Sequence, residues 1–253
     1  MLMQVVVSGL MTHYQRQGNG KVVLLLHGWA DRKETFQAIL PALTEKYTVV
    51  TLDLPGFGQS QAPKEAWGLD DYAKFVQAFL KKLNIADLHG VIGHSNGGAL
   101  AIRAVAQEQL EPKKLILLAA SGVRDNHGVR KLGLKAVAKT GKAATFWLPK
   151  ATKNKLQKKF YGTIGSDMLV APELRETFKR TVKQDIQADA ANIVIPTLLI
   201  YGEQDRATPI SAVGKRLHKL IKDSKLITVP DADHFVHHAS SYDIAKTIIG
   251  FLR

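Results

Sequence analysis

The residues best suited to chemistry in this sequence form the hexapeptide GHSNGG at positions 93–98. A short strand-like run, Leu88–Ile92, precedes it, and apolar residues at helical spacing follow it. A strand that passes into a helix through G-x-S-x-G is the setting of a nucleophile elbow, a sharp turn that needs small residues two positions from the serine. The pattern predicts that Ser95 is a nucleophile, that the Asn96 N–H is an oxyanion donor and that His94 supports the turn.

An activated serine also needs a base and an acid that orients the base. Asp205 follows the apolar run 196–201 and His234 follows the run 226–229, so each emerges at the carboxyl end of a predicted strand. Open α/β sheets build their sites at that edge. The order Ser95, Asp205, His234 is the nucleophile–acid–base order of this arrangement. Asp125, after an earlier strand, is a rival for the acid.

A third segment supplies the remaining donor. Val22–Leu26 predicts a buried strand that ends in His27, Gly28 and Trp29. The backbone N–H of Trp29 is the candidate second oxyanion donor beside Asn96, and we expect His27 to brace this loop. No residues cluster at metal-ligand spacing, so the sequence predicts no metal site.

These motifs resemble the α/β-hydrolase superfamily and, within it, the capped, serine esterase-like branch. The resemblance covers nearly the whole chain and rests on HGW at 27–29, DLPGFGQS at 53–60, GHSNGG at 93–98, GEQD at 202–205 and DHF at 233–235. It implies a mostly parallel twisted sheet with helices on both faces and a helical cap inserted after the sixth strand.

The resemblance also assigns roles. It implies that Ser95 is the nucleophile, that His234 is the general base, that Asp205 is its partner, and that the reaction needs no cofactor. One departure concerns the base loop, because Ala232, between two aspartates, stands where many relatives carry glycine. That leaves the identity of the acid open, although Asp233 is too near His234 in sequence to reach its Nδ1 readily.

The alternation of strand and helix patterns divides the chain into a core at 1–121, a Lys-rich helical cap at 122–192 and the rest of the core at 193–253. In the core we predict an edge hairpin over residues 1–20 with its turn at 18–20, and a capping box at 31–34 that opens a helix. Six cap residues are candidates either to pack within the cap or to face the site: Phe146, Trp147, Phe160, Tyr161, Met168 and Phe178.

Composition narrows the class of protein. At 253 residues with 45% hydrophobic residues and no cysteine, the chain is typical of one globular α/β domain with an insertion. We expect neither a signal peptide nor a membrane span, a cytoplasmic location by default, and a monomer or homodimer.

The formal net charge of +13 is unevenly spread, since residues 121–190 hold fifteen Lys and Arg against six Asp and Glu. No nucleic-acid-binding motif accompanies these cations, so we interpret them as a solvated face and expect no nucleic-acid partner.

The function that this sequence favours is hydrolysis of small carboxylic esters through an acyl-enzyme. The same triad serves lactonases, thioesterases, C–C bond hydrolases, cofactor-free perhydrolases and aminopeptidases, and the fold does not choose among them. A basic cap counts mildly against an aminopeptidase, which needs acidic groups to hold a substrate amine. A ligand-binding module that has lost catalysis is the alternative outside the enzyme class.

Overall fold

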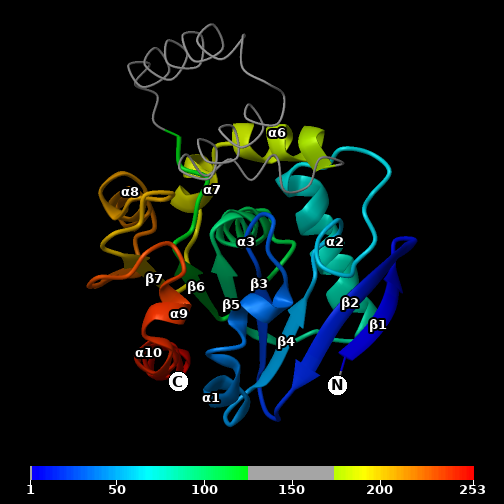
Figure 1. The fold of residues 1–253 in the computed structure, drawn as a ribbon, viewed down its shortest axis with the longest axis horizontal. Coiled ribbons are helices and arrows are strands. Elements are labelled where there is room, and N and C mark those ends of the chain that lie inside the picture. Colours follow the sequence, from blue (N-terminus) through cyan, green and yellow to red (C-terminus); the bar gives the residue numbers. More distant parts are fainter. Residues whose placement is uncertain (1, 125–173) are drawn as a thin grey trace, which may run out of the picture.

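A single twisted sheet organises the computed structural model, which describes residues 2–124 and 174–253 (Figure 1). Its strand order is β1-β2-β4-β3-β5-β6-β7-β8. The pairs β1–β2 and β2–β4 are antiparallel, and every neighbouring pair from β4 to β8 is parallel. The strands are β1 Leu2–Val7, β2 Leu10–Gln17, β3 Val22–Leu26, β4 Thr48–Leu52, β5 Leu88–His94, β6 Lys114–Leu118, β7 Thr197–Gly202 and β8 Ser224–Val229. The predicted fold class, an α/β-hydrolase fold with a mostly parallel sheet, is confirmed.

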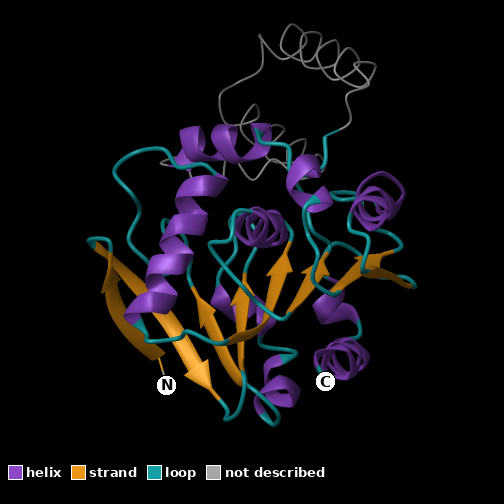
Figure 2. Cartoon of the chain, turned by 180° about the vertical axis from the view of Figure 1, so that it is seen from behind, coloured by secondary structure: helices purple, strands orange, loops and turns teal. Residues whose placement is uncertain are grey.

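Helices cover both faces of this sheet (Figure 2). On one face lie α2 (Leu69–Lys82), α3 (Asn96–Ala106), α7 (Gln187–Ala191) and α8 (Lys215–Leu220), the last preceded by the π-helical turn η4 (Ile210–Gly214). On the other lie the 3₁₀ turn η1 (Lys33–Phe36), α1 (Leu40–Thr44), α9 (Val236–Ala239) and α10 (Ser241–Leu252). The helix α6 (Arg175–Lys183) lies across the start of α2, where the Trp67 N–H donates to Thr177 Oγ1 over 3.1 Å.

The period of two along each central strand divides the core between the faces. In β3, Leu24 and Leu26 pack under α2 and α3, whereas Val23 and Leu25 face η1, α1 and α10. All four side chains are fully buried. A strand buried on both faces explains why this stretch is a continuous apolar run in the sequence.

The edge hairpin forms, but its predicted turn is wrong. β1 and β2 are joined at Ser8 and Gly9, which have φ values of 48° and 81°. Two successive residues of positive φ form the tight turn whose twist matches an antiparallel pair. Residues 18–20 instead connect β2 to β3.

The predicted capping box at 31–34 is also wrong. Asp31 Oδ1 accepts the N–H of its neighbour Arg32, over 2.8 Å, and no side chain caps η1. The Lys33 N–H and its ammonium both bind the buried Asp53, at 2.9 and 2.8 Å. This buried ion pair holds the chain at a 3₁₀ turn, and the predicted helix is divided between η1 and α1.

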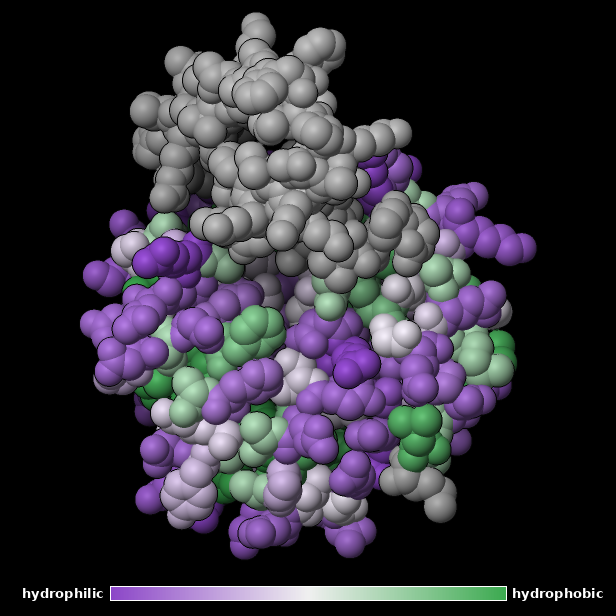
Figure 3. All heavy atoms as spheres, viewed as in Figure 1, coloured by the Kyte–Doolittle hydropathy of each residue, from purple (hydrophilic) through white to green (hydrophobic). Residues whose placement is uncertain are grey.

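Most of the predicted cap lies outside the described residues, so its boundaries stay a prediction. Within the described part of 122–192, α6 and α7 are helical. On the face shown in Figure 3, polar side chains predominate and apolar ones form separate patches among them. No helix in residues 2–124 or 174–253 combines the length and apolarity needed to cross a membrane.

Candidate active site

Ser95 alone makes the turn between β5, which ends at His94, and α3, which begins at Asn96. Its φ of 51° and ψ of −117° lie outside the usual regions for a residue with a Cβ. The predicted need for small neighbours is met. A Cβ on Gly93 would lie 2.5 Å from the Gly97 carbonyl oxygen, and one on Gly97 would collide with the backbone of β3. Close packing of helix against strand therefore holds the serine in this strained turn.

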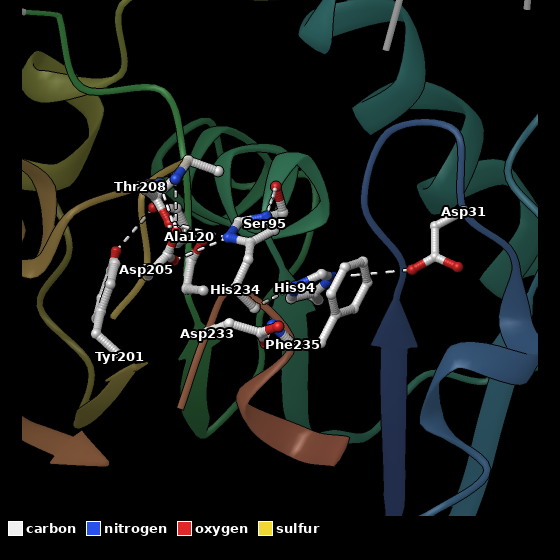
Figure 4. A network of polar contacts seen from close by, with 12 residues as sticks. Asp31, His94, Ser95, Ala120, Tyr201, Asp205, Thr208, Asp233, His234 and Phe235 are labelled. Carbon is white, nitrogen blue, oxygen red and sulfur yellow. Dashed lines mark hydrogen bonds and ion pairs between the residues drawn. The ribbon is translucent and has the colours of Figure 1, made fainter. Parts of the chain in front are cut away.

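The structure brings the three predicted triad side chains together (Figure 4). His234 Nε2 lies 2.9 Å from Ser95 Oγ, and His234 Nδ1 lies 2.8 Å from Asp205 Oδ2. An ionised carboxylate can only accept, so Nδ1 carries the ring proton and Nε2 accepts the serine hydroxyl. This is the tautomer that a general base requires.

Asp205 is held by more than His234. Its Oδ1 accepts the N–H groups of Ala207 and Thr208, at 2.8 and 2.9 Å, and its Oδ2 accepts the Thr208 hydroxyl at 2.7 Å. Burial alone would raise the pKa of Asp205, but the hydrogen bonds and charge of His234 and the bonds from Thr208 outweigh it, so its pKa lies below the ordinary value. The acid therefore stays ionised beside the imidazole.

The loop after β3 reaches the serine through Gly28. A Cβ on Gly28 would lie 3.2 Å from both Ser95 Cβ and His94 Nδ1, tighter than most real contacts. Trp29, next in the chain, packs its ring against Phe57 and Phe178, with centroids 4.9 and 5.1 Å away. Gly28 therefore borders Ser95, and Asn96 follows Ser95 directly as the first residue of α3, where helical N–H groups lack intrahelical acceptors.

His27 is the brace of this loop. Its Nδ1 lies 2.7 Å from the Gly28 carbonyl oxygen, which only accepts, so Nδ1 carries the proton. Its Nε2 accepts the Leu54 N–H over 2.9 Å. Complete burial lowers the pKa of His27, in keeping with a neutral ring. The ring thus fixes the loop after β3 to the turn that follows β4.

His94 connects the turn at Ser95 to the backbone of His234. Its Nε2 donates to the backbone carbonyl of His234 over 3.1 Å, and its ring lies 4.9 Å from the His234 ring. Burial, reinforced by the neighbouring histidines, holds the pKa of His94 well below its usual value. His94 therefore holds the backbone of His234 as a neutral ring.

Two histidines just past His234 connect its loop to η1. His237 Nε2 lies 3.1 Å from Thr35 Oγ1, and His238 Nε2 donates to the Thr35 carbonyl over 2.7 Å. Thr35 belongs to η1, a few residues past Trp29. The helical turn that follows His234 is thus fastened to the segment that follows the oxyanion loop. Their spacing in the sequence could not show this, because Thr35 lies about 200 residues away.

Asp233, Asp125 and the six cap residues are the other candidates that the sequence puts forward. Asp233 Oδ1 accepts the Phe235 N–H over 2.9 Å, as expected of a residue too close in sequence to serve the ring of His234. Asp125 and five of the six cap candidates lie outside the described residues, and the sixth, Phe178, is half-buried against Trp29. Among the residues that the structure describes, no three His, Cys, Asp or Glu side chains group in a way that could hold a metal ion.

Fold and site together define a class: α/β proteins with a serine, a histidine and an aspartate joined in a row beside a strand–helix turn. A family model described as alpha/beta hydrolase fold matches residues 21–157 and 134–240, and the chain therefore belongs to the α/β-hydrolase superfamily.

Named relatives span nearly the full chain. It is 29% identical to the AB hydrolase superfamily protein YisY of Bacillus subtilis, over 92% of each chain. It is 24% identical to the 2-hydroxy-6-oxo-6-(2'-aminophenyl)hexa-2,4-dienoic acid hydrolase of Metapseudomonas resinovorans, over 97% of this chain and 88% of that one. The enol-lactonase of Burkholderia xenovorans shares the fold with a TM-score of 0.74 and 20% identity, over 99% of both chains.

Proposed function

We propose that this chain is a serine hydrolase of the capped, esterase-like branch that cleaves small carboxylic esters through an acyl-enzyme. The observation that supports it is the unbroken relay from Asp205 through His234 to Ser95, with distances of 2.8 and 2.9 Å and the ring proton on Nδ1. A side chain paired in this way is an activated nucleophile rather than a structural serine.

In the first half of the reaction, Ser95 Oγ attacks the ester carbonyl carbon and its proton passes to His234 Nε2. The negative charge that develops on the carbonyl oxygen is met by the N–H groups of Asn96 and Trp29. Collapse of this intermediate breaks the ester C–O bond, and the departing alcohol takes the proton from Nε2. Asp205 stays ionised and stabilises the imidazolium throughout.

In the second half, water takes the place of the serine hydroxyl. His234 accepts a proton from the water as it attacks the acyl carbon, and returns that proton to Ser95 when the acid leaves. The reaction needs no cofactor, because the imidazole of His234 carries every proton that moves. Serine at this position also argues against dehalogenase or epoxide-hydrolase chemistry, in which an aspartate attacks.

A second candidate within the same mechanism is hydrolysis of a C–C bond in a vinylogous diketone, or of a lactone. It is favoured by the names of two proteins that this chain resembles, a hexadienoic acid hydrolase and an enol-lactonase. All three reactions share the acyl-enzyme, so the substrate alone separates them.

The test is a rate comparison across p-nitrophenyl esters of increasing acyl length, with a lactone and a diketone included, for the wild-type chain and for Ser95→Ala. Labelling by a fluorophosphonate, located by peptide mass spectrometry, reports the nucleophile independently of the substrate. We expect label on Ser95 and turnover of at least one short ester. Absence of label from the folded protein would contradict the mechanism, and a preference for the diketone or lactone would replace the ester as the substrate class.

A further inference from the structure

Thr208 places its hydroxyl between the acid and the base of the candidate triad (Figure 4). Thr208 Oγ1 lies 2.7 Å from Asp205 Oδ2, 3.0 Å from the Ala119 carbonyl oxygen and 3.3 Å from His234 Nδ1. Thr208 is 5% exposed, so its hydroxyl contacts these three atoms rather than bulk water. A hydroxyl in this position contacts both partners of the bond that orients the imidazole.

The direction of the hydroxyl proton follows from its partners. A hydroxyl has one proton, and both Asp205 Oδ2 and the Ala119 carbonyl oxygen are acceptors. The carboxylate oxygen is nearer and charged, and pointing the proton elsewhere would leave two lone-pair-bearing oxygens face to face at 2.7 Å. The hydroxyl therefore donates to Asp205, and its oxygen faces the Nδ1–H of His234, whose nearer acceptor is Asp205 Oδ2.

The backbone around Thr208 holds this hydroxyl in place. Pro209 follows it and restricts Thr208 to extended conformations, while the branched Cβ limits the rotation of its side chain. The Thr208 N–H also binds the other oxygen of the carboxylate, Asp205 Oδ1, over 2.9 Å. One residue thus holds both carboxylate oxygens.

We propose that Thr208 is a positioning residue of the candidate triad, whose hydroxyl fixes the Asp205 carboxylate in the plane of the His234 ring. The proposal rests on the proposed function and adds a residue to that same site. Without the hydroxyl, Oδ2 keeps only His234 as a donor, and only the Ala207 and Thr208 N–H groups on Oδ1 still limit rotation of the carboxylate about its Cβ–Cγ bond. The imidazole of His234 is then held less firmly in its orientation, although Ser95, His234 and Asp205 are all still present.

Three substitutions separate the hydroxyl from the rest of the side chain. Thr208→Ser keeps the hydroxyl and loses the methyl group, Thr208→Val keeps the methyl group and loses the hydroxyl, and Thr208→Ala loses both. Thr208→Val places a carbon where the hydroxyl oxygen contacts Asp205 Oδ2 at 2.7 Å, so it introduces crowding, whereas Thr208→Ala introduces none. An equal loss of activity in Thr208→Val and Thr208→Ala therefore excludes crowding as the cause of that loss.

The experiment measures kcat and KM on the best p-nitrophenyl ester of the panel, with thermal unfolding as the check on folding. We expect kcat to fall about 10- to 100-fold in Thr208→Val and Thr208→Ala, the factor that one hydrogen bond to a charged group carries. KM should stay within about twofold, because the imidazole separates Thr208 from the serine. Thr208→Ser should keep most of the wild-type kcat.

Proton NMR of the deshielded Nδ1–H of His234 gives a readout that needs no substrate. We expect this resonance to move in Thr208→Val and Thr208→Ala and to keep its wild-type position in Thr208→Ser. Folded Thr208→Val and Thr208→Ala proteins with wild-type kcat and an unmoved resonance would overturn the proposal, as would a Thr208→Ser protein as impaired as Thr208→Ala. A wild-type protein without turnover would contradict the proposed function alone, and the resonance would still decide the role of Thr208.

Discussion

His237 should make the stability of this protein depend on pH in a way that one substitution removes. The residue is fully buried, and its ring lies 4.8 Å from the ring of His94 and 5.4 Å from that of Phe36. Burial, together with the nearby His238 and His234, lowers its pKa from 6.5 to about 3. Between about pH 3 and pH 6.5 the native state therefore keeps His237 neutral, whereas the unfolded chain protonates it.

The sign and size of the effect follow from linkage. As pH falls below 6.5, the unfolded chain binds a proton at this residue, whereas the native state does not do so until the pH nears 3. Native stability is therefore lost over this window, by about 1.4 kcal/mol per pH unit for one group. Between pH 7 and pH 5 the cost at His237 amounts to about 2 kcal/mol, and above pH 7 it vanishes.

The assay is urea unfolding at pH 7, 6 and 5 for the wild-type chain and for His237→Gln, followed by tryptophan fluorescence. Gln is neutral at every pH used and can still reach Thr35, so only the titration is removed. We expect the free energy of unfolding of the variant to fall by about 2 kcal/mol less than that of the wild type over this range. His218→Gln is the control, since His218 is exposed. A variant whose stability falls in parallel with the wild type would refute the reasoning.

The remaining predictions concern the triad and the charge. Ser95→Ala should remove on the order of 10⁴- to 10⁶-fold of kcat without loss of the fold, and near-wild-type turnover in a clean preparation would rule out the mechanism. Asp205→Asn should cost about 10⁴-fold through the wrong imidazole tautomer, while Asp233→Asn stays mild; a larger loss from Asp125→Asn would show that the acid has been misassigned. If the net charge of +9 across residues 121–190 steers substrates, an ester with a free carboxylate should gain kcat/KM at low salt relative to its neutral analogue. Equal salt dependence of the two esters would leave the charge as a solubility feature.

The sheet could be predicted from the sequence because its strands carry their own signal. Runs such as Val22–Leu26 and Leu115–Leu118 are continuous and apolar, since parallel strands are buried on both faces. The strand–serine–helix turn is equally local, because the collisions that require Gly93 and Gly97 arise within the turn and from the neighbouring strand. Once these elements were in order, parallel pairing brought their carboxyl ends to one edge.

The predicted capping box failed for a different reason, which is a contact from a distant segment. A capping box at 31–34 is locally sound, but Lys33 is drawn to Asp53, twenty residues on, and both side chains are buried. The corresponding reach-back bond forms at the start of α2, where Asp71 accepts the Gly68 N–H over 2.8 Å and no such competitor intervenes. Local propensity decided the outcome only where tertiary contacts allowed it.

Thr208 shows where the sequence signal stops. The local spacing D-x-x-T accounts for the bonds that Asp205 accepts from the backbone N–H groups of Ala207 and Thr208. Nothing in that spacing shows that the hydroxyl will also meet Ala119, from the end of β6, and His234, from the loop after β8. The order of the strands in the sheet places Ala119 and His234 beside Thr208. A side chain that joins the acid to the base is therefore visible only after the sheet has been assembled, and the hydroxyl of Thr208, rather than its place in a motif, is what the substitutions must test.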